Sequence, residues 1–196
     1  MLCGDPIKIY KTKVADKDVI IYRTLIGAPA TTCIMEELHS RGVNTFIIFG
    51  SCGELTSNIK KGAFIIPTEA YRDEGTSYHY LPASEFIKID SSKELEEIFK
   101  EKNIPYESTK IWTTDALYKE TTNKLKDRVS RGCKVVDMEC ASIMAVAKSR
   151  GFKAYQFLYT DDTLDNNSWD IKTLKDDRTD ILKKCLDISF EIIKKI

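Results

Sequence analysis

Residues 132–140 of this 196-residue chain read GCKVVDMEC, a β-branched run that leads directly into two carboxylates separated by a methionine. β-Branched residues favour strands, and a helical pattern begins straight after the run, which predicts the strand-to-helix junction of an α/β fold. Ligands of open α/β sheets bind at the carboxyl ends of the strands. We therefore expect Asp137 and Glu139 to accept hydrogen bonds from a hydroxyl-bearing ligand, with Met138 as an apolar face beside them. The alternative is that Glu139 only occupies the first helical turn, where the helix dipole favours an anion.

The same alternation of strand and helix extends over the whole chain. Apolar runs predict strands at 18–26, 44–49, 63–67, 108–113, 134–136 and 153–159. Helical periodicity predicts helices ending near residue 40, at 95–102, at 139–150 and through 181–193. These elements predict an α/β fold, with residues 1–196 as a single domain in which helices flank a mixed, twisted central sheet on both sides.

Composition excludes several classes of protein. Thirty basic residues balance thirty acidic ones, so no net charge attracts nucleic acid or an anionic membrane. No apolar run approaches the roughly 20 residues that span a bilayer, and the first residues do not resemble a signal peptide. Six cysteines without a C-x-x-C pair predict neither a metal site nor a disulfide framework. We expect a cytoplasmic protein, with Cys33, Cys140 and Cys185 as small buried side chains.

Polar or glycine-rich sequence stands at four predicted strand ends, at 50–53, 72–77, 137–139 and 160–162. Parallel strands would bring these ends to one edge of the sheet. The GSCG sequence at 50–53 allows backbone amides to approach an anion, with the Ser51 hydroxyl as a further donor, although an ordinary turn has the same composition.

Two further strand ends also have two interpretations. The Arg72-Asp73-Glu74 run is either a surface charge run or a buried guanidinium–carboxylate pair. Asp161 is a candidate general acid because a cleft can raise the pKa of a carboxyl group. Its alternative role is that of a turn former, for which Asp162 is equally suited.

The order of seven short motifs resembles the nucleoside phosphorylase family, which includes purine nucleoside phosphorylases, uridine phosphorylases and adenosylhomocysteine/methylthioadenosine nucleosidases. The motifs are GDP at 4–6, GAP at 27–29 with EEL at 36–38, GSCG at 50–53, RDEGTS at 72–77, TDALY at 114–118, VDME at 136–139 and TD at 160–161. They cover essentially the whole chain. The resemblance implies the three-layer fold of that family and cleavage of an N-glycosidic bond.

The resemblance also implies a role for each site residue. Met138 and Glu139 would bind the ribose with Asp137 in support, and Asp161 would protonate, or hydrogen-bond, N7 of a purine. Phosphate would be bound by Gly4, Lys8 and Ser51, and the base by Cys52, Gly53, Leu117 and Tyr118.

Several positions depart from the family pattern. Ile48 stands where phosphorolysing members usually carry an arginine, and Lys8 stands where another arginine is usual. Losing a guanidinium removes a bidentate phosphate contact. Thr121 and Asn123 occupy the positions of the glutamine and arginine of uridine phosphorylases, and Leu117 replaces a base-stacking phenylalanine. A purine is therefore the expected base.

Three functions remain open from the sequence. The first is phosphorolysis of a purine nucleoside to free base and ribose 1-phosphate, with inorganic phosphate as co-substrate, no cofactor and a homo-oligomeric state (a dimer or a trimer of dimers). The second is a hydrolytic nucleosidase that uses water, which Ile48 favours. The third is a non-catalytic nucleoside-binding homologue, against which the presence of both Glu139 and Asp161 argues.

Overall fold

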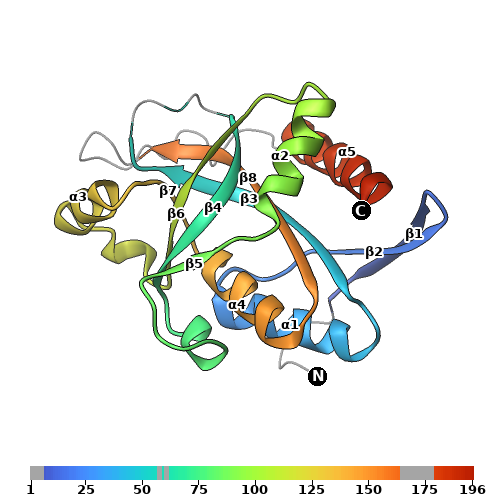
Figure 1. Cartoon of the computed structure of the whole chain (residues 1–196), viewed down its shortest axis with the longest axis horizontal. Helices are drawn as coiled ribbons and strands as arrows, with labels where there is room; N and C mark the ends of the chain where they lie inside the picture. Colours follow the sequence, from blue (N-terminus) through green and yellow to red (C-terminus); the bar gives the residue numbers. More distant parts are fainter. Residues whose placement is uncertain (1–6, 57–58, 60–61, 164–178) are drawn as a thin grey trace.

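The computed structural model describes residues 7–56, 59, 62–163 and 179–196 (Figure 1). Its elements are β1 (Ile9–Val14), β2 (Lys17–Tyr22), α1 (Ala28–Ser40), β3 (Thr45–Glu54), β4 (Phe64–Asp73), η1 (Thr76–His79), β5 (Phe86–Lys88), α2 (Ser92–Glu101), β6 (Tyr106–Thr114), η2 (Leu117–Lys119), α3 (Thr122–Ser130), β7 (Cys133–Asp137), α4 (Cys140–Arg150), β8 (Lys153–Thr163) and α5 (Thr179–Lys195). The two η elements are 3₁₀ turns. The predicted mixed α/β fold is confirmed.

The central sheet is six-stranded, in the order β5-β4-β6-β7-β3-β8. Strand pairs β4–β6, β6–β7 and β3–β8 are parallel, whereas β4–β5 and β3–β7 are antiparallel. A further antiparallel pairing of Phe64 with Tyr159 and of Ile65 with Leu158 joins β4 to β8, so the strongly twisted sheet closes on itself. Strands β1 and β2 form a separate ribbon that projects from the body (Figure 1).

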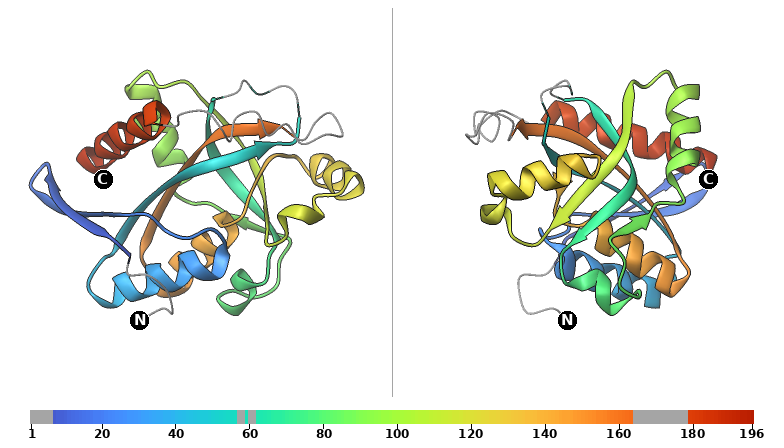
Figure 2. Two further views of the ribbon diagram at one scale, coloured as in Figure 1. Left: turned by 180° about the vertical axis from the view of Figure 1, so that it is seen from behind. Right: turned by 60° about the vertical axis from the view of Figure 1, so that its left-hand side comes forward.

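Helices cover the sheet on two sides, as the sequence predicted. Helices α1 and α4 pack together on one side, and α2 and α5 on the other (Figure 2). Every residue of α4 from Cys140 to Ala147 is buried, since the helix lies between the sheet and α1. The helix ends at Gly151, whose φ of 76° is the left-handed conformation that glycine adopts without strain.

Several predicted boundaries are wrong. Strand β3 continues to Glu54, so the GSCG sequence at 50–53 lies within a strand and is neither a turn nor a loop that wraps an anion. Strands β4 and β8 also extend past their predicted ends, into the polar residues that follow. Strand β1 and helix α3 were not predicted. Cys33 is exposed, whereas Cys140 and Cys185 are buried as expected.

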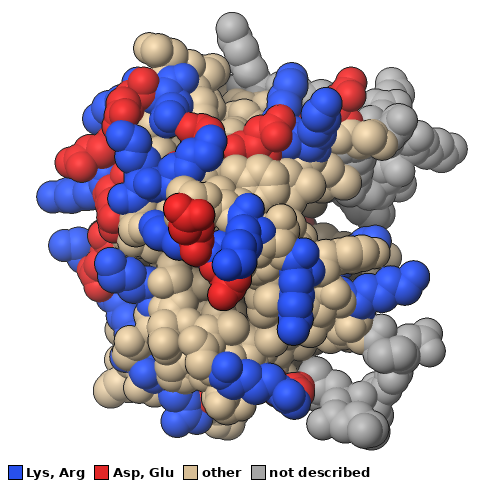
Figure 3. Space-filling model, turned by 90° about the vertical axis from the view of Figure 1, so that its right-hand side faces the viewer, with Lys and Arg blue, Asp and Glu red and all other residues tan. Residues whose placement is uncertain are grey.

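The surface matches the balanced composition. On the face drawn in Figure 3, lysine and arginine side chains are interspersed with acidic ones. Within the part of the chain that the structure describes, no helix has both the length and the apolar character needed to cross a bilayer.

Candidate active site

The junction between β7 and α4 is organised by a buried carboxylate. Asp137 Oδ1 accepts a hydrogen bond of 2.8 Å from the Thr113 hydroxyl, and Oδ2 accepts one of 2.7 Å from the backbone N–H of Cys140 and one of 3.3 Å from that of Glu139. Asp137 therefore caps α4 from the end of β7. Asp137 is buried, and both of its carboxylate oxygens accept hydrogen bonds from protein groups, one of them the backbone N–H of Glu139.

Glu139 is half-buried and is the N-cap residue of α4. Its Oε1 accepts a hydrogen bond of 2.6 Å from the backbone N–H of Gly27, the N-cap of α1. Gly27 has a φ of 104°, which side-chain-bearing residues rarely adopt. The carboxylate thus lies at the N-terminus of α1, so Glu139 is more than an anion in the first turn of α4.

Burial makes this pair of carboxylates electrostatically unusual. Desolvation, and next the charge of Glu139, raise the pKa of Asp137 to about 7, although hydrogen bonds from Thr113 and two backbone amides act in the opposite direction. Desolvation also raises the pKa of Glu139, against the effect of the Gly27 N–H. Negative charge held in a poorly solvated site interacts strongly with a nearby developing positive charge.

Asp161 is singled out by a β-bulge. In the pairing of β3 with β8, Cys52 is opposite Thr160 and Gly53 is opposite Asp162, which leaves Asp161 as the extra residue. Bulges next to active sites redirect a side chain out of the regular alternation. Thr160 anchors the start of the bulge, since its Oγ1 accepts a 3.2 Å hydrogen bond from the backbone N–H of Ala63.

The residues assigned to phosphate lie on different elements. Ser51 is exposed on β3 opposite Tyr159, Lys8 is exposed just before β1, and Gly4 lies outside the described residues. Ile48 is half-buried on β3, paired with Gln156, and packs against the apolar core.

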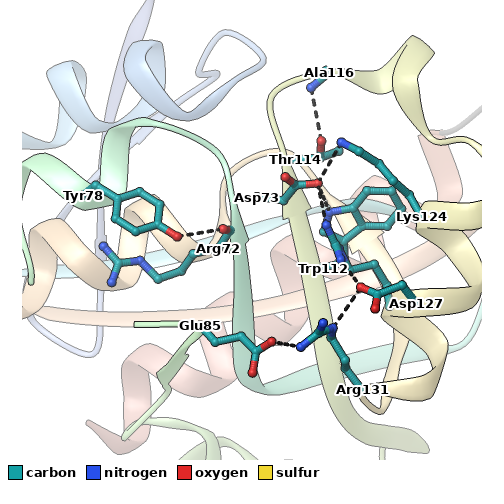
Figure 4. Close-up of polar contacts among 11 residues, drawn as sticks. Arg72, Asp73, Tyr78, Glu85, Trp112, Thr114, Ala116, Lys124, Asp127 and Arg131 are labelled. Atoms are coloured by element: carbon teal, nitrogen blue, oxygen red, sulfur yellow. Dashed lines mark hydrogen bonds and ion pairs between the residues drawn. The ribbon is translucent and has the colours of Figure 1, made fainter. Parts of the chain in front are cut away.

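Arg72 itself fits neither interpretation of the 72–74 run. Its guanidinium is buried and donates to the oxygens of its own following loop, namely Ser77 Oγ (2.9 Å), Ser84 Oγ (2.9 Å) and the carbonyls of Pro82 (2.6 Å) and Leu81 (3.2 Å). Among the described residues, the Arg72 guanidinium is therefore neither a surface charge nor paired with a carboxylate, whereas Asp73 of the same run pairs with the Arg128 guanidinium. Tyr78 returns along the same loop and donates to the Arg72 carbonyl at 3.0 Å (Figure 4).

The residues assigned to the base divide into two groups. Cys52 and Gly53 are buried within β3, whereas Leu117 and Tyr118 lie on η2 with 37% and 86% of their surface exposed. Just before Leu117 and Tyr118, Asp115 Oδ2 accepts a hydrogen bond of 2.9 Å from the backbone N–H of Gly75.

Sequence reasoning missed the two partners that hold the carboxylates. Thr113 reaches Asp137 because the parallel register of β6 and β7 places these residues opposite each other. Gly27 and Glu139 are 112 positions apart in the chain. No local pattern contains either contact.

Comparison with known proteins identifies the family of this chain. A family model described as "Phosphorylase superfamily" matches residues 3–195. The chain belongs to the phosphorylase superfamily.

Two relatives named as phosphorylases agree with this assignment. The chain is 29% identical over 150 residues to a guanosine phosphorylase of Halorubrum lacusprofundi, which covers 75% of this chain and 62% of the relative. It is 24% identical over 179 residues to a DeoD-type purine nucleoside phosphorylase of Bacillus cereus, covering 89% of this chain and 75% of that protein. This superfamily member thus spans only 62% of the length of the Halorubrum protein.

The fold also matches a solved structure, that of purine nucleoside phosphorylase from Toxoplasma gondii in complex with immucillin-H. The TM-score is 0.81 at 22% sequence identity, and the match covers 97% of this chain and 79% of the other. At this identity the likeness establishes the fold.

Proposed function

We propose that this member of the phosphorylase superfamily cleaves a purine nucleoside by phosphorolysis and releases the free base and ribose 1-phosphate. The observation that carries the proposal is the half-buried carboxylate of Glu139, held by Gly27 at 2.6 Å beside Met138 at the end of β7. Two relatives named guanosine phosphorylase and purine nucleoside phosphorylase support the reaction class.

In this proposal Glu139 accepts hydrogen bonds from the ribose hydroxyls while Met138 packs against the sugar. As the C1′–N9 bond breaks, positive charge develops at the ribosyl centre, and the buried carboxylate stabilises that charge more than it stabilises the neutral substrate. Asp137 contributes by fixing the junction, since its oxygens accept from Thr113, Glu139 and Cys140.

The electron pair of the broken bond goes to the purine, and Asp161 delivers a proton, or a strong hydrogen bond, to N7 of that leaving group. A phosphate oxygen then forms the new bond to C1′. Asp161 is suited to this role because the bulge in β8 takes it out of the regular strand alternation.

Phosphate in this proposal is bound by Lys8, Ser51 and Gly4 without a metal or organic cofactor. The base is bound by Cys52, Gly53, Leu117 and Tyr118. Ile48 packs against the core at the position where an arginine is usual, so we expect phosphate to bind weakly. We further propose that the protein assembles as a homo-oligomer, a dimer or a trimer of dimers, which light scattering of the purified protein tests.

Ile48 also favours a second candidate, the hydrolytic nucleosidase. The deciding experiment incubates the purified protein with inosine, guanosine, adenosine and uridine, with and without phosphate, and measures base release. Phosphorolysis requires release of a purine base that depends on phosphate. Equal release without phosphate supports the hydrolase, and nucleoside binding without any release supports the non-catalytic homologue.

A further inference from the structure

Asp73, the last residue of β4, holds three donors on a single carboxylate oxygen. Its Oδ2 accepts hydrogen bonds from Trp112 Nε1 at 3.1 Å and Lys124 Nζ at 3.2 Å (Figure 4). The third donor is Arg128 Nη2, at 3.2 Å. Trp112 lies on β6, and both cationic residues lie on α3. One carboxylate therefore connects the two ends of the segment 113–123, which includes η2.

Helix α3 is attached both by this contact and by Leu125 and Val129, which pack against the apolar cluster that contains Trp112. Its most buried residue is Arg128, whose guanidinium lies over the Tyr71 ring at 4.1 Å. The guanidinium pairs with Asp127 and Asp73, and its Nε is buried without a hydrogen-bond partner among the described residues. Removing the Asp73 charge leaves a poorly solvated cation with less compensation, so the attachment of α3 to β4 is weakened.

Residues 115–121, between the two anchored ends, have exposed or half-buried side chains. Leu117 and Tyr118 are among them, and η2 buries no residue. A segment with so little burial takes its position from the points where it is attached. Those points include the Asp73 contacts and the hydrogen bond from Gly75 to Asp115.

We propose that Asp73 is a positioning residue that holds the base-binding segment 115–121 in place through Trp112, Lys124 and Arg128. The proposal rests on the role proposed above for Leu117 and Tyr118 in binding the base. Base contacts made equally in the bound substrate and the transition state affect KM rather than kcat. Loss of the anchor therefore raises the KM for the nucleoside, and leaves kcat and the KM for phosphate near those of the wild type.

The test compares Asp73→Asn and Lys124→Met with Lys126→Met, a matched control at an exposed lysine of the same helix. The first readout is the rate of tryptic cleavage after the exposed Lys119, relative to cleavage after the exposed Arg41. The second readout is steady-state kinetics with guanosine. We expect faster relative cleavage at Lys119 and about a tenfold rise in the guanosine KM for both anchor variants, the scale of one lost charged hydrogen bond. Lys126→Met should match the wild type.

Unchanged cleavage ratios in both anchor variants overturn the proposal, as does faster cleavage with an unchanged guanosine KM, or a loss confined to kcat. Lys124→Met keeps the test decisive if Asp73→Asn does not fold, since Lys124 is at the partly exposed side of the contact. If the wild type cleaves no nucleoside, the proposed function fails by itself. The cleavage ratio then still decides whether Asp73 holds the segment.

Discussion

Replacing Glu139 by glutamine separates the charge of this residue from its size. The amide oxygen of glutamine can still accept the hydrogen bond from Gly27, so the contact between the α4 and α1 termini is retained. We therefore expect the midpoint of thermal unfolding to stay close to that of the wild type. The lost quantity is the negative charge beside the sugar.

The size of the effect follows from Coulomb's law. A unit charge about 5 Å from a reaction centre, in an effective dielectric of about 20, contributes about 3 kcal/mol. Because the transition state carries only part of a full positive charge, we expect a loss near 2.7 kcal/mol, or about 10²-fold in kcat/KM. The assay is the initial rate of guanine release from guanosine at saturating phosphate.

Glu97→Gln is the matched control, since Glu97 is exposed on α2. It should keep the wild-type rate. A folded Glu139→Gln protein with unchanged kcat/KM would contradict a catalytic role for this charge, because the carboxylate would then serve only to join the two helix ends.

Three further predictions concern the acid, the phosphate site and pH. Asp161→Asn should slow cleavage of guanosine by about 10²-fold or more, yet spare 7-methylguanosine, whose leaving group needs no proton at N7; equal loss on both substrates, or damage by Asp162→Asn instead, contradicts the assignment. Ile48→Arg should lower the KM for phosphate relative to Ile48→Met, an uncharged control; an unchanged KM contradicts the idea of a weakened phosphate pocket. Burial raises the pKa of Asp137 from 3.8 to about 7, so its contribution to the free energy of unfolding is present below pH 4 and is lost as pH rises through 7. The free energy of unfolding of Asp137→Asn, measured with urea, should therefore not show this fall between pH 4 and 7. Parallel curves of unfolding free energy against pH for variant and wild type would contradict the prediction.

The elements that sequence predicted well are those with strong local patterns. The C-terminal helix α5 has clear periodicity, and the β7–α4 junction carries a β-branched run followed by a helix that Gly151 ends. Helix α3 was not predicted because it is mostly polar: two apolar side chains, Leu125 and Val129, pack against the core, and Arg128 adds its contacts with Asp73 and Tyr71.

Other features depend on contacts between distant parts of the chain. Strand β3 runs through two glycines to Glu54 because β8 on one side and β7 on the other pair with it. The β1–β2 ribbon turns at Ala15 and Asp16, both with positive φ, where asparagine or glycine would have signalled a hairpin. Pairing of β4 with β8 closes the sheet by a contact of high sequence separation.

In the candidate site, too, local patterns were predicted and contacts between distant residues were not. The sequence placed Met138 and Glu139 at a strand-to-helix junction, and the structure has them there. The sequence could not predict that Glu139 contacts Gly27, or that Asp137 accepts hydrogen bonds from Thr113 and the start of α4. Both sets of contacts arise from tertiary packing.

The most direct test of the proposed phosphorolysis identifies the sugar product. Purified protein is incubated with guanosine and inorganic phosphate, and the reaction is followed by phosphorus NMR. Phosphorolysis predicts a ribose 1-phosphate signal that grows in step with guanine release, at the expense of the inorganic phosphate signal. Guanine release with free ribose and a constant phosphate signal would contradict it.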